Sequence, residues 1–247
     1  MRQHSSASRL PVQAGGHGRI KGLTPQALLG LHPFFSTLVP GDVVKFLART
    51  HCRSVASGRT IFRKDDPGDG LDGVLAGNVA FTIGSRDGQD LILNVLGPGE
   101  FFGEIALLGG GGRSATARAR SPCQLLFIPR REFLSLFAER PEAMIQIIAL
   151  LCVRLRRSTD YIADSTFLGF SPRLAKQLIV MLGEAGPAPH TVLRISQAEL
   201  ASMLGVSRER VNRQLVAWAR SGILDQCRSR VVVRERRALE HIIASGL

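Results

Sequence analysis

The residues with the clearest potential for chemistry lie between Gly99 and Ala115. In this stretch a Gly-Glu-Ile triplet is followed, after three apolar residues, by four glycines and an Arg-Ser-Ala triplet. The guanidinium of Arg113 can bind two oxygens of a phosphodiester, and backbone N–H groups of a short helical turn near Gly103 can bind others. Glu104 can accept a hydrogen bond from a ribose hydroxyl. The pattern predicts a site for a small phosphorylated ribose, formed by Gly103, Glu104, Ile105, Arg113, Ser114 and Ala115. The alternative is a plain glycine-rich turn with a solvated Arg-Ser pair.

A second group of functional side chains is predicted near the C-terminus. Ser196 and Glu199 have the spacing of a capping box and open a helix that Gly205 ends, and Ser207 caps the next helix. This pattern predicts a helix-turn-helix motif over residues 197–216, whose second helix enters the major groove of DNA. The alternative is a solvated charged helix. The DNA-binding residues would be Ser207, Arg208, Glu209, Arg210, Asn212 and Arg213, with Arg228 and Arg230 in a basic hairpin that contacts phosphates.

The length allows one large domain or two ordinary ones, and the charge favours an anionic partner. The chain has 247 residues, of which 45% are apolar, and 32 Lys and Arg against 20 Asp and Glu give a formal charge of +12. Nucleic acid or a membrane surface would attract such a chain. No apolar run is long enough to span a bilayer, and residues 1–22 lack the apolar core of a secretory signal. We expect a cytoplasmic protein that has no membrane partner and begins with a flexible tail over residues 1–27.

The metal-binding residue types are scattered. Cys52, Cys123, Cys152 and Cys227 show no CxxC spacing, which argues against a zinc site and against a disulfide framework. His51 and His190 lack convergent partners, so surface positions are favoured over haem ligation. We therefore expect no metal and no haem.

The elements that must position the first site read as short strands. Apolar runs such as Val79 to Ile83 and Leu91 to Leu96 alternate with turns rich in Gly, Pro and Asp. This texture indicates an antiparallel barrel or jelly roll with the phosphate stretch inside it. After Pro129 the spacing of apolar residues becomes helical. The predicted fold class is therefore α+β, with a jelly-roll barrel, one long helix and a winged helix-turn-helix.

The long helix is predicted from about Pro141 to Asp164, with apolar residues on a heptad seam formed by Met144, Ile148, Leu151, Leu155 and Ile162. Such a seam requires a partner helix, and a parallel homodimer is the simplest source. Ser158 continues the seam, with Thr159 beside it. A polar residue there can specify register, bond the carbonyl of its own helix, or bind a ligand.

These motifs together resemble the Crp/Fnr family of bacterial transcription regulators, over roughly residues 34–233. The Gly-Glu and Arg-Ser-Ala triplets are similar to its phosphate-binding cassette, which implies cyclic AMP as the effector, with cyclic GMP second. The resemblance further implies that Ser158 and Thr159 reach the adenine amino group, one hydroxyl from each subunit. The implied domains are residues 28–140 for the nucleotide, 141–166 for dimerisation, 167–172 as a hinge and 173–247 for DNA.

The resemblance also implies how DNA is read. Arg208 and Arg213 would bind guanines and Glu209 a cytosine amine, so that two inverted TGTGA-like half-sites form the operator. Arg210 replaces a smaller residue of the family, which implies either an added phosphate contact or a changed preference. RNA polymerase is a possible further partner, although the loop over residues 183–190 does not match the family's polymerase-contacting loop.

Two departures and two alternatives remain. Asp72 stands where the family often has an aromatic residue, and no cysteine precedes Cys52, which argues against the iron–sulfur cluster of some family members. A regulator that binds DNA without any nucleotide is one alternative. An enzyme acting on cyclic nucleotides is the other, although the chain shows no metal cluster and no placed nucleophile and base.

Overall fold

The computed structural model describes residues 22–32, 35, 38–84, 90–139, 142–185, 192–227 and 229–246. Residues 1–21 of the predicted tail, Arg228 and most of the 183–190 loop lie outside these ranges. The prediction of a tail up to residue 27 is wrong for its last part. Leu23 packs on the core, and its backbone N–H donates to the carbonyl of Leu75 at 2.9 Å.

The N-terminal half contains two antiparallel four-stranded sheets that face each other. The first sheet has the order β1 (His51–Val55), β8 (Cys123–Pro129), β3 (Gly70–Ala76) and β6 (Phe101–Phe102). The second has the order β2 (Thr60–Phe62), β7 (Thr116–Ala119), β4 (Val79–Gly84) and β5 (Asp90–Leu96). Apolar side chains of both sheets meet between them, among them Val74, Leu125, Val79 and Ala117. This is the predicted barrel.

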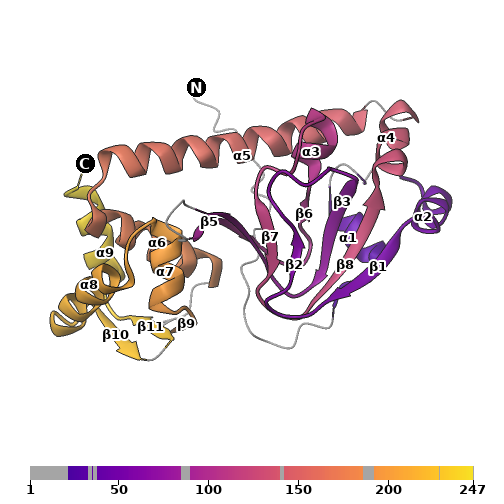
Figure 1. The fold of residues 1–247 in the computed structure, drawn as a ribbon. Coiled ribbons are helices and arrows are strands. Elements are labelled where there is room, and N and C mark those ends of the chain that lie inside the picture. Colours follow the sequence, from indigo (N-terminus) through magenta and orange to yellow (C-terminus); the bar gives the residue numbers. More distant parts are fainter. Residues whose placement is uncertain are drawn as a thin grey trace, which may run out of the picture.

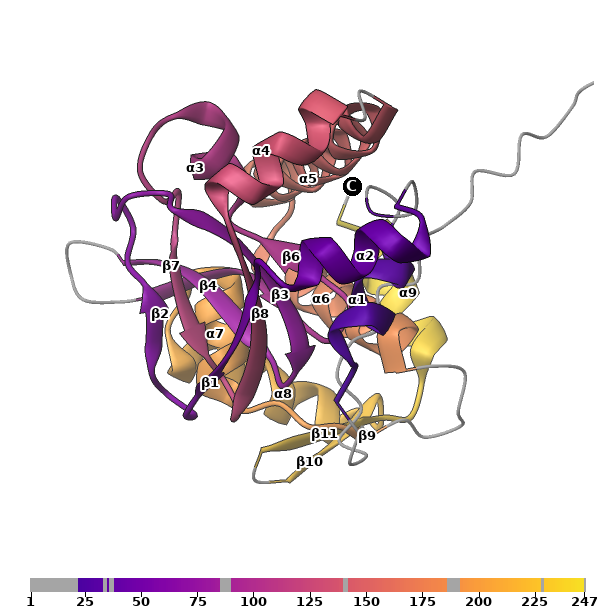
Figure 2. The same ribbon diagram turned by 90° about the vertical axis from the view of Figure 1, so that its right-hand side faces the viewer.

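Helices cover the outer face of the first sheet, as Figure 2 shows. They are α1 (Pro25–Leu31), α2 (Pro40–Leu47) and α4 (Arg130–Glu139). Thr24 caps α1, since its hydroxyl accepts the N–H of Ala27 at 3.1 Å, and Pro25 fits the first turn because its missing N–H has no helical partner there. Leu28, Leu71 and Phe133 are buried in the resulting core.

Helix α5 (Glu142–Phe167) runs for 26 residues along the barrel and on to the C-terminal half (Figure 1). Its seam faces solvent in the single chain, with Ile148 54%, Leu155 67% and Ile162 64% exposed. No helix in the described part of the chain is both long and apolar enough to cross a membrane. The helix α6 (Phe170–Ala185) follows after Leu168 and Gly169, so the interruption is shorter than the predicted hinge of residues 167–172. Pro172 lies in the first turn of α6, where a proline breaks no hydrogen bond.

The C-terminal half is a winged helix-turn-helix. Helices α7 (Gln197–Leu204) and α8 (Arg208–Arg220) are followed by the wing strands β10 (Leu224–Cys227) and β11 (Arg230–Val233) and by α9 (Arg236–Ala244). A short strand, β9 (Val192–Leu193), completes a sheet of order β10, β11, β9. Val211, Leu215 and Trp218 form the buried face of α8, as their helical spacing predicts. The α+β class and the order of the three parts agree with the sequence prediction.

Candidate functional site

The predicted phosphate stretch forms a tight turn into a short helix, α3 (Glu104–Gly109). Gly103 precedes the helix with φ of 99°, a left-handed conformation that side chains disfavour. A Cβ atom at this position would lie 2.3 Å from Nη1 of Arg113. Glycine is therefore needed both for the backbone angle and for the close approach of the arginine.

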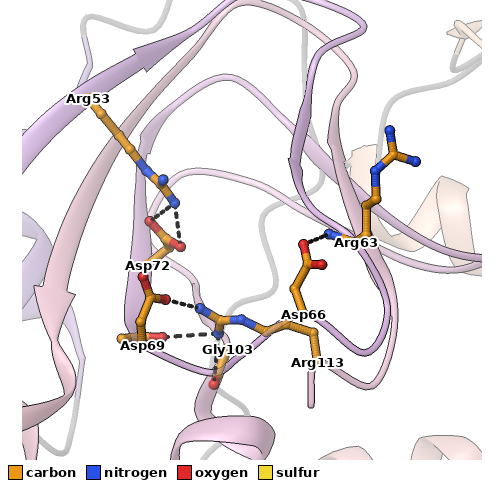
Figure 3. Close-up of polar contacts among 8 residues, drawn as sticks. Arg53, Arg63, Asp66, Asp69, Asp72, Gly103 and Arg113 are labelled. Atoms are coloured by element: carbon orange, nitrogen blue, oxygen red, sulfur yellow. Dashed lines mark hydrogen bonds and ion pairs between the residues drawn. The ribbon is translucent and has the colours of Figure 1, made fainter.

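Arg113 is only 3% exposed, and both of its terminal nitrogens donate hydrogen bonds (Figure 3). Its Nη1 donates to the carbonyls of Gly70 at 3.0 Å and Gly103 at 3.1 Å, and its Nη2 donates to Asp69 at 2.9 Å. Its guanidinium lies 4.2 Å from the ring centroid of Phe62. The cation is thus fixed in position before any ligand arrives, and its one charged partner, Asp69, has a side chain that is 73% exposed.

Glu104 is 1% exposed and forms an ion pair with Arg154 of α5. Arg154 also donates to the carbonyl of Phe101 at 2.6 Å, which fixes its guanidinium against the barrel. The buried polar atoms without a hydrogen-bond partner among the described residues include Oε2 of Glu104 and Nε of Arg113. Buried polar atoms are rarely left unpaired, so a ligand could satisfy both by placing a donor beside the carboxylate oxygen of Glu104 and an acceptor beside the N–H of Arg113.

The remaining cassette residues surround these charges. Ala115 is buried, whereas Ser114 and Ile105 are exposed, the latter to 47%. The donor and acceptor set fits a cyclic nucleotide, because Arg113 suits a phosphate and the free oxygen of Glu104 suits a hydroxyl.

Ser158 and Thr159 lie on the exposed surface of α5, and no hydrogen bond joins the side chain of either to the cassette among the described residues. The hydroxyl of Ser158 donates to the carbonyl of Arg154 at 3.2 Å, and that of Thr159 donates to Leu155 at 3.0 Å. These are the bonds within the helix that the sequence left open as an alternative. Their contact with a base stays a prediction that needs the second subunit.

On the DNA-reading side, Ser207 caps α8, since its hydroxyl accepts the N–H of Arg210 at 3.3 Å. Arg208, Glu209 and Arg213 are all exposed. The guanidinium of Arg210 lies 4.7 Å from the ring centroid of Phe170, at the start of α6. A hollow of about 480 Å³ lies there, lined by Phe170, Ser171, Arg210, Arg213, Gln214 and Ala217.

The side chain of Asn212, in the N-terminal half of α8, accepts hydrogen bonds from two other elements. Its Oδ1 accepts from Nε2 of Gln197 in α7 at 2.9 Å and from Nε2 of Gln226 in the wing at 3.3 Å. Arg230 is exposed at the start of β11, as predicted for a wing residue, and Arg228 lies outside the described residues.

Comparisons with known proteins match both the barrel and the C-terminal domain. Family models match residues 52–140 as a cyclic nucleotide-binding domain and residues 172–242 as a Crp-like helix-turn-helix domain. The cyclic AMP receptor protein of Thermus thermophilus is 36% identical over 216 residues, covering 87% of this chain and 98% of that protein. The chain belongs to the Crp/Fnr family of transcription regulators.

Two further Crp/Fnr relatives show how the family varies. The CRP-like cAMP-activated global transcriptional regulator of Mycobacterium tuberculosis is 32% identical over 169 residues, which cover 67% of this chain and 75% of that protein. The solved structure of CLP, the c-di-GMP responsive global regulator of Xanthomonas campestris, has a TM-score of 0.70 at 30% identity and covers 79% of this chain and 99% of that one. Relatives of this kind are regulators and not enzymes, which removes the enzyme alternative.

Sequence reasoning missed several groups of this Crp/Fnr regulator. Arg154 precedes Ser158 by four residues and so lies on the same face of α5, a spacing that could have revealed it. Asp69 lies in the Pro-Gly-Asp-Gly turn before β3, where only its acidic character hinted at a role. The contacts of Gln197 and Gln226 with Asn212 could not be predicted, because residues that meet only in the folded chain have no characteristic spacing in the sequence.

Asp72, which departs from the family pattern, has a structural partner. It is 0% exposed, and both of its oxygens accept from Nη2 of Arg53, at 2.7 and 2.8 Å (Figure 3). Burial raises the pKa of Asp72 to about 6, although the charge of Arg53 opposes this. The family's aromatic residue is therefore replaced by an ion pair inside the barrel wall.

Proposed function

We propose that this Crp/Fnr regulator binds DNA as a homodimer under the control of a cyclic nucleotide, with cyclic AMP the first candidate and cyclic GMP the second. The observation that carries the proposal is the pair of buried, unsatisfied atoms, Nε of Arg113 and Oε2 of Glu104, on residues that flank α3 and the glycines after it. Burying charged groups with unpaired atoms is costly, and a bound nucleotide would supply the missing partners.

The phosphate of the nucleotide would bind Arg113. Asp69 already neutralises this arginine, but its side chain is largely exposed, so it can leave for water at little cost when a phosphate takes its place. The carbonyls of Gly70 and Gly103 would keep the guanidinium in position during the exchange. The ribose would bind Glu104, which Arg154 orients, and Ser114 and the backbone at Ile105 and Ala115 would complete the cradle.

The base would engage Ser158 and Thr159, one hydroxyl from each subunit. Both hydroxyls now donate to carbonyls of α5, so each must rotate to donate to the base, while its oxygen can accept without rotation. Ligand binding would in this way join the barrel of one subunit to the helix of the other.

The exposed seam of α5 supports a parallel dimer, because Ile148, Leu155 and Ile162 are each more than half exposed in the single chain. Leu155→Glu should give a monomer in sedimentation equilibrium. Arg156→Glu, on the next residue and off the seam, is the matched control and should leave the dimer intact. A wild-type protein that sediments as a monomer would overturn the dimer.

In the dimer the two α8 helices would enter successive major grooves about 34 Å apart. Arg208 and Arg213 would bind guanines and Glu209 a cytosine, with Ser207, Arg210, Asn212, Arg228 and Arg230 on the flanking backbone or bases. Since coupling between two binding sites is reciprocal, DNA should tighten nucleotide binding by the same factor as nucleotide tightens DNA binding.

The deciding experiment is a calorimetric titration with cyclic AMP, cyclic GMP and cyclic di-GMP, with and without a duplex carrying two inverted TGTGA half-sites. Micromolar binding of one nucleotide, tightened by DNA, is expected for the wild type. Arg113→Leu should abolish it, whereas Arg118→Leu, an exposed arginine on β7, should not. DNA binding without heat from any nucleotide would instead support the nucleotide-independent alternative.

A further inference from the structure

The barrel and the DNA-binding domain touch through α7. Helix α7 packs on β5 of the barrel, as Figure 1 shows. Leu91 of β5 reaches the turn between α7 and α8, where its Cδ1 lies 3.5 Å from the position of a Cβ built on Gly205. Arg120, in the turn after β7, forms an ion pair with Glu199 of α7. An apolar contact and an ion pair thus flank the first helix of the DNA-reading motif.

Glu199 is fixed at both of its oxygens. Oε2 accepts from the backbone N–H and the hydroxyl of Ser196, each at 2.9 Å, which completes the capping box of α7. Oε1 is the partner of Arg120. Burial alone would raise the pKa of Glu199, but the bonds from Ser196 and the charge of Arg120 outweigh it and leave the pKa below its usual range. The carboxylate therefore stays ionised at neutral pH.

Arg120 is equally well placed from the barrel side. Its backbone N–H donates to the carbonyl of Asn78 at 2.8 Å, and its own carbonyl accepts from the hydroxyl of Ser57 at 3.0 Å. The two side chains of the ion pair are 32% and 31% exposed, so solvent screens the pair only in part. Both residues of the ion pair are thus anchored by further hydrogen bonds, Arg120 through its backbone and Glu199 through its side chain.

A second ion pair links the long helix α5 to the first helix of the DNA-binding domain, α6. Nζ of Lys176 in α6 lies 2.7 Å from Asp164 in α5, across the junction at Leu168 and Gly169. The DNA-binding domain is thus held at the hinge and again at α7. Two separated ties restrict rotation, whereas one alone leaves the hinge angle open.

The docked arrangement leaves the reading helix uncovered. Arg208, Glu209 and Arg213 are exposed while α7 is held against β5. A contact that inhibits DNA binding by masking would cover these side chains, whereas this one involves α7 and the turn at Gly205.

We propose that Arg120 and β5 of the nucleotide barrel are positioning elements for DNA reading, which hold α7 so that α8 is presented at a fixed angle. This inference rests on the proposed dimeric DNA function. Two half-sites are bound together only if both α8 helices stand at the right separation and angle, and free rotation lowers the effective concentration of the second helix at its half-site. A single half-site makes no such demand.

The test compares a duplex with two inverted half-sites against one with a single half-site. If the wild type shows no preference for TGTGA, the palindrome that it selects from a random pool is used. Arg120→Ala and Glu199→Gln should each weaken binding to the double site about 3- to 10-fold and leave single-site binding unchanged. Glutamine retains the capping box, so Glu199→Gln removes only the charge that Arg120 meets. Arg118→Ala is the control for loss of positive charge from the barrel.

The double variant separates a direct contact from two independent effects. Arg120→Ala with Glu199→Gln should cost no more than either change alone. Additive losses of affinity in the double variant, or equal losses of affinity on both duplexes, would overturn the proposal. Tighter binding of the variants to the double site would also overturn it, because the contact would then inhibit DNA binding.

A readout without DNA keeps the inference separate from the proposed function. In hydrogen exchange, Arg120→Ala should speed exchange of the amides of β5 and α7 relative to Arg118→Ala. Faster exchange in a protein whose wild type binds no palindrome would mean that the docking is real and the proposed function wrong. Unchanged exchange would refute the docking itself.

Discussion

The barrel and the reading helix hold their arginines in opposite ways. Arg113 is 3% exposed and has three hydrogen-bond acceptors around its guanidinium. Arg208 and Arg213 of α8 are exposed to solvent. A small ligand inside a barrel meets a cation that the fold has already oriented, whereas DNA meets side chains that become ordered only on contact.

The difference sets which substitutions damage the fold and which damage binding alone. Removing one partner of a buried ion pair leaves an uncompensated charge and costs stability as well as affinity. Removing an exposed arginine costs only what the partner supplied, and salt weakens that contribution further.

The largest effect at neutral pH is expected for Arg154→Leu, because it strands the carboxylate of Glu104 in the barrel. We expect the free energy of unfolding to fall by about 3 kcal/mol, measured by urea denaturation. Adding Glu104→Gln should recover much of this loss, since the stranded charge is then gone. Arg156→Leu on the exposed side of α5 should change little. If the double variant were no more stable than Arg154→Leu, the buried charge would not be the cause.

Arg213→Ala tests the opposite case. DNA affinity should fall by about 1 to 3 kcal/mol with loss of preference at one base pair, measured by fluorescence anisotropy on matched and substituted duplexes. The unfolding free energy should stay within about 0.5 kcal/mol of the wild type, because the side chain is exposed. A stability loss as large as that of Arg154→Leu would break the comparison.

The pH dependence of stability compares two buried titratable groups of the N-terminal half, Asp72 and His32. The pKa of Asp72 is raised from 3.8 to about 6, so its contribution is present below 3.8 and lost as the pH rises to 6. Burial and then the charge of Arg154 lower the pKa of His32 from 6.5 to about 4, so its contribution is present above 6.5 and lost as the pH falls to 4. In the wild type, the two groups therefore change the free energy of unfolding in opposite directions as the pH changes.

Asp72→Asn should expose the histidine slope alone. Its free energy of unfolding should fall between pH 6.5 and 4 by up to about 1.4 kcal/mol per pH unit, measured by urea denaturation at each pH. A variant whose pH profile matches that of the wild type would show that Asp72 does not titrate in this range.

The smallest effect is expected for Ser158→Ala, which removes one exposed hydroxyl. Nucleotide affinity should fall by about 1 kcal/mol, roughly fivefold, with no loss of stability, because the lost bond within the helix is exposed to water. Calorimetry checks the affinity, and Ser165→Ala on the same helix is the control. Unchanged affinity would place the base elsewhere.

The sequence predicted those parts of the fold that depend on local patterns. The capping box of Ser196 and Glu199, the end of α7 before Gly205 and the apolar face of α8 are all short-range, and the structure has them as predicted. Gly103 and Arg113 also lie together as predicted, on either side of α3 and the glycines after it, and Arg113 donates to the carbonyl of Gly103.

Contacts between distant segments could not be predicted. Arg154 meets Glu104 across 50 residues and Arg120 meets Glu199 across 79, and no spacing rule joins such pairs. Asp72 was read only as a mismatch, because its partner on β1 becomes a neighbour only when the sheet forms. The edges of the hinge were missed because a proline is compatible with the first turn of a helix as well as with a loop.

If α8 enters the major groove as proposed, the amide of Asn212 would limit which bases this helix distinguishes. Its oxygen is already engaged by Gln197 and Gln226, so only its NH₂ group is left to face the groove. Recognition of adenine by asparagine uses both ends of the amide, one to donate to N7 and one to accept from N6. An asparagine whose acceptor is occupied offers donors alone, which suit guanine N7 and O6 or thymine O4. The two glutamines would thus turn a potential adenine reader into one that disfavours adenine.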